Sequence, residues 1–349
     1  MERVYVKRQA LRPSHKKAPR KSPLSLYFFI IVCFAIWFVW HSLTPTLPAL
    51  GEPPRLYSNQ CRQDLTLIFL EAIKKSNRSL FLVMFGLTDP AILQALVKKT
   101  EQTFQTTVYY DTKGSPNLYR ILENCEIHPI RQEGFMHHKI LILDDEMVFL
   151  GSANMTTPSL RMHDNLVIGL VNKNIASFLQ QKTPYSYGHL STPVGGQNVD
   201  LWLLPDPNGH ALTEIKRKLR GANRMIRAAL FTFTHPALVD ELLIAHRKGV
   251  AVTVVIDMHS GLGASAKTVA ALKKAGIRIL FSRGQQLLHH KFVLIDEATL
   301  IAGSANWTKA AFTKNNDCLI MLHNLTHEQK SYMNHLWKRI AITAQEVLD

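Results

Sequence analysis

Residues 137–154 read HHKILILDDEMVFLGSAN, and residues 289–306 read HHKFVLIDEATLIAGSAN. Both stretches fit one template, in which His-x-Lys is followed by four residues, an Asp, six residues and Gly-Ser-x-Asn. We call these stretches the first motif and the second motif. They begin 152 residues apart, and both have the required residue at every position of the template. An offset this large indicates that a whole structural unit is duplicated and that each copy is organised around its motif.

Each motif carries side chains suited to binding a phosphate and to moving protons. The apolar runs 140–143 and 292–295 that follow His-x-Lys predict short buried strands. On an extended chain the His and Lys, two residues apart, can emerge on the same face. Histidine can act as nucleophile or general acid near neutral pH, and lysine, asparagine and serine supply donors to phosphoryl oxygens. The motifs therefore predict a phosphate-binding site that needs no metal ion.

The doubled motif resembles the HKD motifs of the phospholipase D superfamily. In that family two motifs form one active site across a pseudo-twofold axis. One histidine attacks phosphorus to give a phosphohistidine, and the other protonates the leaving alcohol and then activates water. The resemblance implies that His137 is the nucleophile and His289 the general acid and base, with the reverse assignment left open.

The resemblance also implies roles for the other motif residues. The expected ligands of the phosphate oxygens are Lys139, Lys291, Asn154 and Asn306, with Ser152 and Ser304 beside them. Asp144 and Asp296 complete the catalytic motif and are expected to brace it rather than to perform chemistry. His138 and His290 are expected to point away from the site as packed or hydrogen-bonded partners.

The family also has an acidic residue, usually Glu, after Gly-Ser-x-Asn that orients a catalytic imidazole. Asp164 and Asp317 are the candidates for this role in the two halves. Their spacings from the preceding motif Asn differ by one residue.

Charge and cysteine content narrow the class of ligand but do not choose one. The chain has 349 residues and a formal charge of +15, of which residues 1–22 contribute a net +7. This charge suits an anionic lipid surface as well as nucleic acid. The four cysteines form no CxxC or zinc-type spacing, so no metal and no cofactor is expected. Cys61 and Cys125 could form a disulfide or remain free thiols.

The N-terminal part predicts a membrane anchor. Residues 24–40 are an unbroken apolar run behind a basic tail, residues 1–23, which predicts a single-pass signal-anchor with a cytoplasmic N-terminus. The catalytic part would then lie on the other side of the membrane. A cleaved signal peptide, giving a secreted protein, is the alternative. Residues 41–57 contain four prolines and are expected to form a semi-rigid spacer.

Two α/β lobes with mostly parallel sheets are expected beyond this spacer, because strand-like and helix-like segments alternate in both halves. The predicted lobes are residues 58–172 and 199–349, joined by a polar linker, residues 173–198. One active site is expected at the lobe interface. Since both motifs lie in one chain, a monomer can complete the site.

These features predict a membrane-anchored, phospholipase D-like phosphodiesterase whose substrate is a glycerophospholipid of the bilayer. A nuclease with the same two-histidine chemistry is the main alternative. A cardiolipin synthase-type phosphatidyltransferase and a catalytically silent membrane tether are further alternatives.

Overall fold

The computed structural model describes residues 27–35, 44–100, 105–123, 125–283 and 286–346. The chain divides into two units, Met1–Pro45 and Thr46–Asp349. In the first unit residues 27–35 form a helix with exposed side chains, and the predicted tail, residues 1–23, lies outside the described residues. No helix in the described ranges combines the length and the apolar character needed to cross a membrane. The predicted spanning segment, residues 24–40, extends beyond the described residues at both ends.

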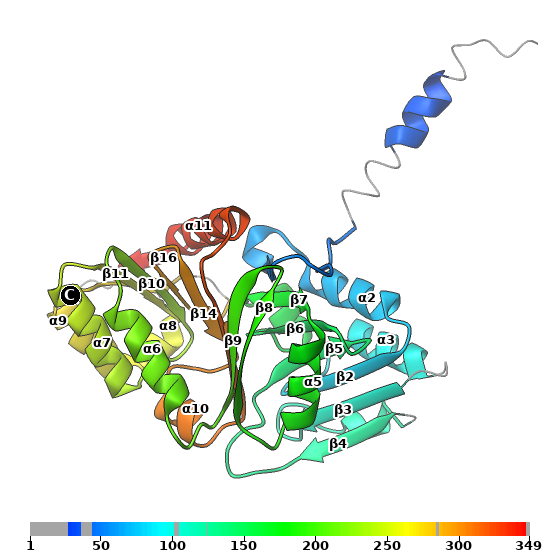
Figure 1. The fold of residues 1–349 in the computed structure, drawn as a ribbon, viewed down its shortest axis with the longest axis horizontal. Coiled ribbons are helices and arrows are strands. Elements are labelled where there is room, and N and C mark those ends of the chain that lie inside the picture. The colour runs from blue at the N-terminus through cyan, green and yellow to red at the C-terminus, as the bar shows by residue number, and fades with distance from the viewer. Residues whose placement is uncertain (1–26, 36–43, 101–104, 124, 284–285, 347–349) are drawn as a thin grey trace, which may run out of the picture. The chain divides into compact units, whose positions relative to one another are not determined.

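The second unit contains two mixed β-sheets (Figure 1). The first has the strand order β1-β7-β6-β5-β2-β3-β4. Its strands are β1 (Arg55–Tyr57), β2 (Ser79–Met84), β3 (Gln105–Asp111), β4 (Glu126–Ile130), β5 (Lys139–Leu143), β6 (Met147–Gly151) and β7 (Val167–Val171).

The second sheet has the order β16-β12-β11-β10-β13-β14-β15-β9-β8. The order β7-β6-β5-β2-β3-β4 recurs in it as β15-β14-β13-β10-β11-β12, which confirms the duplication. Its strands are β8 (Gly188–Val194), β9 (Gln197–Leu204), β10 (Met225–Leu230), β11 (Ala251–Ile256), β12 (Arg278–Ser282), β13 (Lys291–Ile295), β14 (Thr299–Gly303), β15 (Asp317–Leu322) and β16 (Ala344–Glu346).

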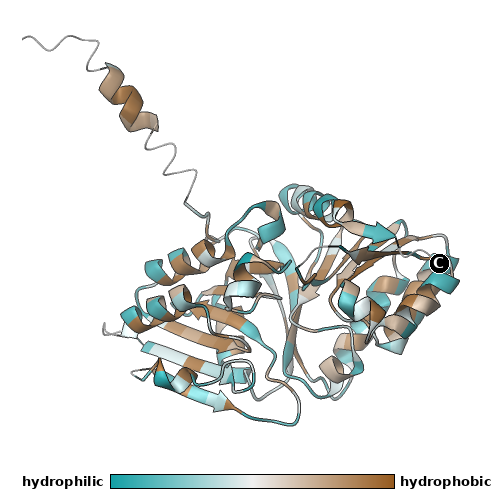
Figure 2. Ribbon diagram, turned by 180° about the vertical axis from the view of Figure 1, so that it is seen from behind, coloured by the Kyte–Doolittle hydropathy of each residue, from teal (hydrophilic) through white to brown (hydrophobic). Residues whose placement is uncertain are grey.

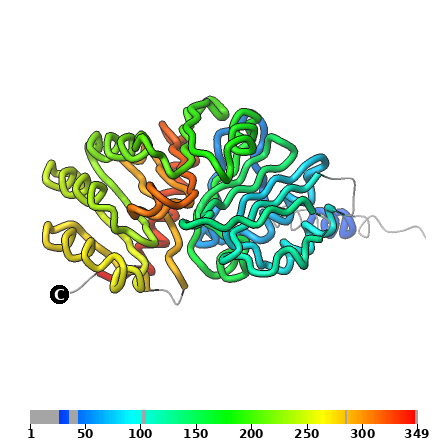
Figure 3. Tube along the Cα trace, turned by 90° about the horizontal axis from the view of Figure 1, so that it is seen from below, coloured from blue at the N-terminus to red at the C-terminus, as the bar shows by residue number. Residues whose placement is uncertain are grey.

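Helices cover the outer faces of the two sheets, and the inner faces share one core with two further helices, residues 173–182 and 327–342. Val83 and Ile140 of the first sheet belong to the same buried cluster as Ala229 and Phe292 of the second. Figure 2 shows the apolar strands between more polar helices, and Figure 3 shows the two halves side by side. The helices are η1 (Asn59–Cys61), α2 (Leu65–Lys75), α3 (Pro90–Thr100), η2 (Leu118–Arg120), α4 (Thr157–Arg161), α5 (Lys173–Lys182), α6 (His210–Arg220), α7 (Pro236–Arg247), α8 (Met258–Leu262), α9 (Ala266–Lys274), α10 (Lys309–Thr313) and α11 (His327–Ile342).

The expectation of mostly parallel sheets is wrong. Parallel pairing is confined to β2-β3-β4 and β10-β11-β12, and the other neighbouring strands are antiparallel. The physical reason lies in the motifs, each of which forms a hairpin. Asp144 and Asp145 have φ values of 54° and 60°, and a two-residue turn of this kind joins antiparallel strands. Asp296 and Glu297 repeat this turn in the second motif, with φ values of 52° and 56°.

Two segments expected to be irregular carry regular structure. Residues 173–198, predicted as the linker, form α5 and β8, and β8 pairs with β9 of the second sheet. The predicted spacer, residues 41–57, ends in β1, which pairs with β7. Cys61 and Cys125, the candidate disulfide pair, are free thiols.

Candidate active site

The two lobes meet through backbone contacts immediately before the motif histidines. Met136 bridges to Asn316, and Leu288, 152 residues further on, bridges to Asp164. The backbone N–H of His137 donates to the carbonyl oxygen of Asn316 at 2.8 Å. Each motif histidine therefore lies against the chain that follows the motif of the other half.

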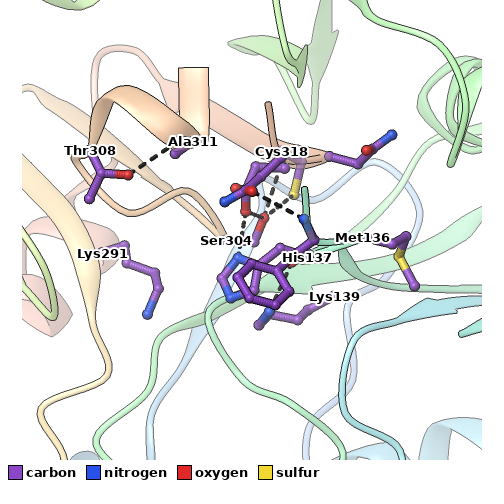
Figure 4. Close-up of polar contacts among 12 residues, drawn as sticks. Met136, His137, Lys139, Lys291, Ser304, Thr308, Ala311 and Cys318 are labelled. Atoms are coloured by element: carbon purple, nitrogen blue, oxygen red, sulfur yellow. Dashed lines mark hydrogen bonds and ion pairs between the residues drawn. The ribbon is translucent and has the colours of Figure 1, made fainter. Parts of the chain in front are cut away.

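His137 is held by a carboxylate of the opposite lobe. Its Nδ1–H donates to Oδ1 of Asp317 at 2.7 Å, and the hydroxyl of Ser304 donates to the same oxygen at 2.7 Å (Figure 4). Burial alone would raise the pKa of Asp317, but His137, Lys139 and Ser304 lower it below its ordinary value. Asp317 is thus an ionised acceptor that leaves Nε2 of His137 with a free lone pair, and its predicted orienting role is consistent with this geometry.

His289 has the same arrangement without the charge. Its Nδ1–H donates to Oδ1 of Asn165 at 3.0 Å, and the Ser152 hydroxyl donates to that oxygen at 2.8 Å. The amide of Asn165 is fixed in turn, because its Nδ2 donates to the carbonyl oxygen of Ser159 at 2.8 Å. Asn165 is therefore the neutral counterpart of Asp317.

The structure corrects the prediction of Asp164 as the orienting residue. Asp164 lies one position before Asn165, the residue that contacts His289. The backbone N–H of Asp164 donates to the carbonyl oxygen of Leu287 at 2.9 Å. Burial, with a contribution from Asp257, raises the pKa of Asp164 to about 7. The offset of 152 residues that relates the motifs relates Asn165 to Asp317, which was the signal available in the sequence.

The motif lysines are buried beside the histidines. Nζ of Lys139 donates to the carbonyl oxygen of His137 at 2.8 Å, and Nζ of Lys291 donates to that of His289 at 2.9 Å. Each ammonium also lies over an aromatic ring, Phe85 at 5.2 Å and Phe231 at 4.9 Å respectively. These two rings are site residues that the sequence analysis missed.

The lysines and the burial of the site shape its electrostatics. Burial lowers the pKa of Lys139 to about 7 and that of Lys291 well below its ordinary value. Burial and Lys139 lower the pKa of His137, and Asp317 acts in the opposite direction. Burial, Lys291 and Lys139 lower the pKa of His289 well below its ordinary value, with no carboxylate bonded to it. A bound anion would relieve this excess of positive charge.

The four predicted phosphate ligands other than lysine fall into two groups. The single hydroxyl donors of Ser152 and Ser304 are directed at Asn165 and Asp317, so the serines hold the orienting residues rather than a phosphate. The Oδ1 atoms of Asn154 and Asn306 are buried and have no hydrogen-bond partner among the residues that the structure describes. The role of these two asparagines as phosphate ligands stays a prediction.

Asp144 lies at the far end of the first motif strand, where it caps the start of β2. Its carboxylate accepts the backbone N–H groups of residues 77–79 at 2.7–3.1 Å. Asp296 accepts those of residues 223–225 in the same way, at 2.8–2.9 Å. Both aspartates brace the hairpins, as expected, and their contacts give no support to a catalytic role.

His138 and His290 point away from the catalytic groups, as expected. Both are fully buried, and burial lowers the pKa of each to about 3. His290 is hydrogen-bonded to Gln60, whereas neither ring nitrogen of His138 has a partner within the described part of the chain.

Two further aspartates position the motif histidines and were not among the predicted site residues. Oδ2 of Asp111 accepts the backbone N–H of Met136 at 3.1 Å, and Oδ2 of Asp257 accepts that of Leu288 at 3.1 Å. The signal for them in the sequence was an Asp at the end of one parallel strand in each half, as the last residue of β3 and directly after β11. Within the described ranges, no group of three or more His, Cys, Asp or Glu side chains is arranged to hold a metal ion.

Comparison with known proteins agrees with this architecture. The family model described as "Cardiolipin synthase, PLD-like domain" matches residues 69–183 and 215–337. The two matches cover more than half of the chain, and each contains one motif. The chain therefore belongs to the phospholipase D superfamily.

Individual relatives match about a third of the chain. The mitochondrial cardiolipin hydrolase of Xenopus laevis is 32% identical over 111 residues, which are 32% of this chain and 52% of that protein. The human mitochondrial cardiolipin hydrolase is 33% identical over 116 residues, 33% of this chain and 46% of that protein. The chain thus spans about half the length of these relatives. A phosphatidylserine synthase of Haemophilus influenzae shares the fold, with a TM-score of 0.66 and 12% identity over 87% of this chain and 90% of that one.

Proposed function

We propose that this protein is a membrane-anchored phosphodiesterase that hydrolyses glycerophospholipids through a phosphohistidine formed on His137. The observation that carries the proposal is the unequal pairing of the two catalytic histidines. His137 has the ionised carboxylate of Asp317 on its Nδ1, and His289 has the neutral amide of Asn165. A carboxylate on Nδ1–H stabilises the positive charge that His137 acquires when its Nε2 bonds to phosphorus.

The first step transfers the phosphatidyl group to the protein. Nε2 of His137 forms a bond to phosphorus, and the bond between phosphorus and the oxygen of the head-group alcohol breaks. The anionic phosphodiester, once bound, favours the protonated form of His289, which then gives its Nε2 proton to the departing oxygen. Lys139 and Lys291 supply the positive charge that stabilises the phosphoryl oxygens in the transition state.

The second step returns the protein to its starting state. A water molecule gives a proton to Nε2 of His289 while its oxygen bonds to phosphorus. The bond between phosphorus and His137 then breaks, which releases phosphatidic acid and leaves His289 protonated for the next cycle. His289 thus acts as an acid in the first step and as a base in the second.

The choice of a lipid substrate rests on three further observations. The relatives from Xenopus laevis and human, which match about a third of the chain, are cardiolipin hydrolases by name. The apolar run, residues 24–40, would keep the catalytic unit at a bilayer, with the basic tail on the cytoplasmic side. The positive charge of the chain suits an anionic lipid surface.

The test uses the full-length protein reconstituted in vesicles in the presence of EDTA. Vesicles of phosphatidylcholine, phosphatidylglycerol or cardiolipin, and separately single- and double-stranded DNA and RNA, are offered to the wild type and to His137→Ala and His289→Ala. His128→Ala serves as the matched control, because His128 lies partly exposed on the edge strand β4, where it pairs with Glu126 and stacks on Tyr109. Phosphatidic acid or free head group, lost in both motif variants and kept in the control, is expected. Cleavage of nucleic acid alone would replace the lipid assignment with a nuclease.

A further inference from the structure

A short segment near the start of the second unit braces the second half of the active site. This segment, residues 55–63, is here termed the strap and comprises β1, Ser58, η1 and the two residues that follow η1. Its β1 strand pairs with β7 of the first lobe. Gln63 accepts a hydrogen bond from the Tyr332 hydroxyl of α11 at 2.7 Å. The strap therefore contacts both the sheet of the first lobe and the helix α11.

Asn59 of the strap holds the backbone that carries Asn165. Its Oδ1 accepts the backbone N–H of Asn165 at 3.3 Å, and its Nδ2 donates to the carbonyl oxygen of His163. Asn165 is the residue whose side chain fixes Nδ1 of His289. One side chain thus restrains the loop on both sides of Asp164.

Gln60 holds the residue next to the catalytic histidine. Nε2–H of the buried His290 donates to Oε1 of Gln60 at 2.7 Å, while Nδ1 of His290 has no partner among the described residues. The hydrogen bond to Gln60 is therefore the polar contact that fixes the orientation of this ring. His290 separates His289 from Lys291, so its position limits the movement of both.

The first half of the site is held differently. Asp317 lies in β15 and is paired with Leu204 of β9, so the sheet itself fixes the backbone of the residue that orients His137. His138, which corresponds to His290, has no polar partner in the described part of the chain. Asn165 precedes β7, and its backbone N–H is bonded to the Asn59 side chain. Among the described residues, the polar side-chain contacts of the strap therefore reach the half-site of His289 and not that of His137.

We infer that Asn59 and Gln60 are positioning residues. They hold the His289 side chain in the orientation from which it donates a proton to the leaving group. The inference rests on the proposed role of His289. Loss of either contact is expected to slow cleavage whenever the leaving oxygen needs a proton and to spare substrates whose leaving group departs as an anion. General acid catalysis contributes roughly 10²- to 10⁴-fold, so a mispositioned donor can forfeit a large part of this factor.

The test compares two lipids with the full-length protein in mixed micelles. Phosphatidylcholine has an alcohol leaving group that needs protonation, and phosphatidyl-p-nitrophenol releases a stable anion. The compared quantity is kcat/KM, because it depends only on the steps up to and including the first irreversible one. It therefore does not include the hydrolysis of the intermediate. The variants are Asn59→Ala, Gln60→Met and Gln60→Glu. Arg55→Ala is the control, because the Arg55 side chain pairs with Glu52 and lies on the strap away from the motifs.

For Asn59→Ala and Gln60→Met we expect kcat/KM to fall at least about 30-fold with phosphatidylcholine and less than about 3-fold with phosphatidyl-p-nitrophenol. Gln60→Glu keeps the acceptor and should stay within about 3-fold of the wild type for both lipids, as should Arg55→Ala. Equal losses with both lipids, or no loss with either, would overturn the inference. If Asn59→Ala does not fold, the contrast between Gln60→Met and Gln60→Glu decides.

The same assay separates this inference from the proposed function on which it rests. His289→Ala must show the largest difference between the two lipids if His289 is the proton donor. If His289→Ala loses both activities equally, the assignment of His289 is wrong. If the loss of kcat/KM differs between the two lipids for His289→Ala but not for the strap variants, His289 is the proton donor and the proposed role of the strap is wrong.

Discussion

Asn165 and Asp317 occupy the same position in the two halves of the chain, and each accepts a hydrogen bond from Nδ1 of a motif histidine. The distances are similar, 3.0 Å from His289 to Asn165 and 2.7 Å from His137 to Asp317, but only Asp317 carries a charge. The two half-sites are otherwise symmetric, but their histidines differ in the charge of the group bonded to Nδ1. The substitution Asn165→Asp would add a charge beside His289, and Asp317→Asn would remove the charge beside His137.

Replacement of Asn165 by Asp should raise the pKa of His289. Burial and the two motif lysines lower that pKa in the native protein, and a carboxylate on Nδ1 favours the protonated imidazole. The general acid must be protonated, so the fraction of His289 that can act falls as pH rises through this pKa. We therefore expect the limb of the kcat profile that reports His289 to move up by about 1 pH unit. A kcat profile with neither limb moved in a folded Asn165→Asp variant would contradict the role given to His289.

Replacement of Asp317 by Asn should act on the nucleophile. Asp317 raises the pKa of His137 and stabilises the charge formed on attack, so its loss weakens both effects. We expect kcat to fall about 10³-fold, and the acid limb of the profile to move to lower pH because His137 stays neutral there. The measurement is a pH series with phosphatidyl-p-nitrophenol, which isolates the attack from proton donation. A change of less than about 10-fold would favour the reverse assignment of the two histidines.

Removal of the Asp144 carboxylate should reduce stability and leave the chemistry intact. Asp144→Ala leaves the backbone N–H groups of residues 77–79 without their acceptor and places Ala at a φ of 54°. We expect the free energy of unfolding to fall by about 2–4 kcal/mol, measured by urea titration. Glu146, which is partly exposed and whose carboxylate lies 3.9 Å from the Lys173 ammonium, is replaced by Ala as the control and should cost less than about 0.5 kcal/mol. A kcat that falls more than about 10-fold in the folded Asp144→Ala protein would return Asp144 to the catalytic set.

Activity should survive a chelator, because Lys139 and Lys291 provide the charge that stabilises the phosphoryl oxygens. Turnover in EDTA is expected to equal turnover in the untreated protein. Dialysis against the chelator, followed by addition of magnesium, calcium or zinc, checks this directly. Loss of turnover that a divalent ion restores would require a metal in the mechanism.

The motifs predicted that each motif histidine and lysine lie side by side, because spacing along a strand decides which side chains share a face. Lys139 and Lys291 accordingly lie beside the histidines two residues before them. Asp317 was predicted from the family resemblance, in which an acidic residue follows Gly-Ser-x-Asn, whereas Asn165 was missed. Asn165 is not acidic, and the acidic Asp164 lies next to the position that the 152-residue offset selects.

Other features depend on contacts that no local pattern encodes. Asn59 and Gln60 reach residues more than 100 positions away, and an ordinary polar triplet in a loop gives no sign of this. The antiparallel half of each sheet was misjudged although its signal was present. Asp144-Asp145 and Asp296-Glu297 form tight turns between two apolar runs, and such turns close hairpins rather than crossovers.

The central claim, that His137 carries the covalent intermediate, can be tested by mass spectrometry. Full-length His289→Ala is mixed with phosphatidyl-p-nitrophenol, quenched at alkaline pH to preserve phosphohistidine and digested with trypsin. The two histidine pairs fall on separate peptides, residues 132–139 and residues 284–291. We expect the phosphatidyl adduct on peptide 132–139, at His137 rather than His138, and its loss in a variant that also carries His137→Ala. An adduct on peptide 284–291 of the His137→Ala protein, with none on peptide 132–139 of the His289→Ala protein, would contradict the assignment.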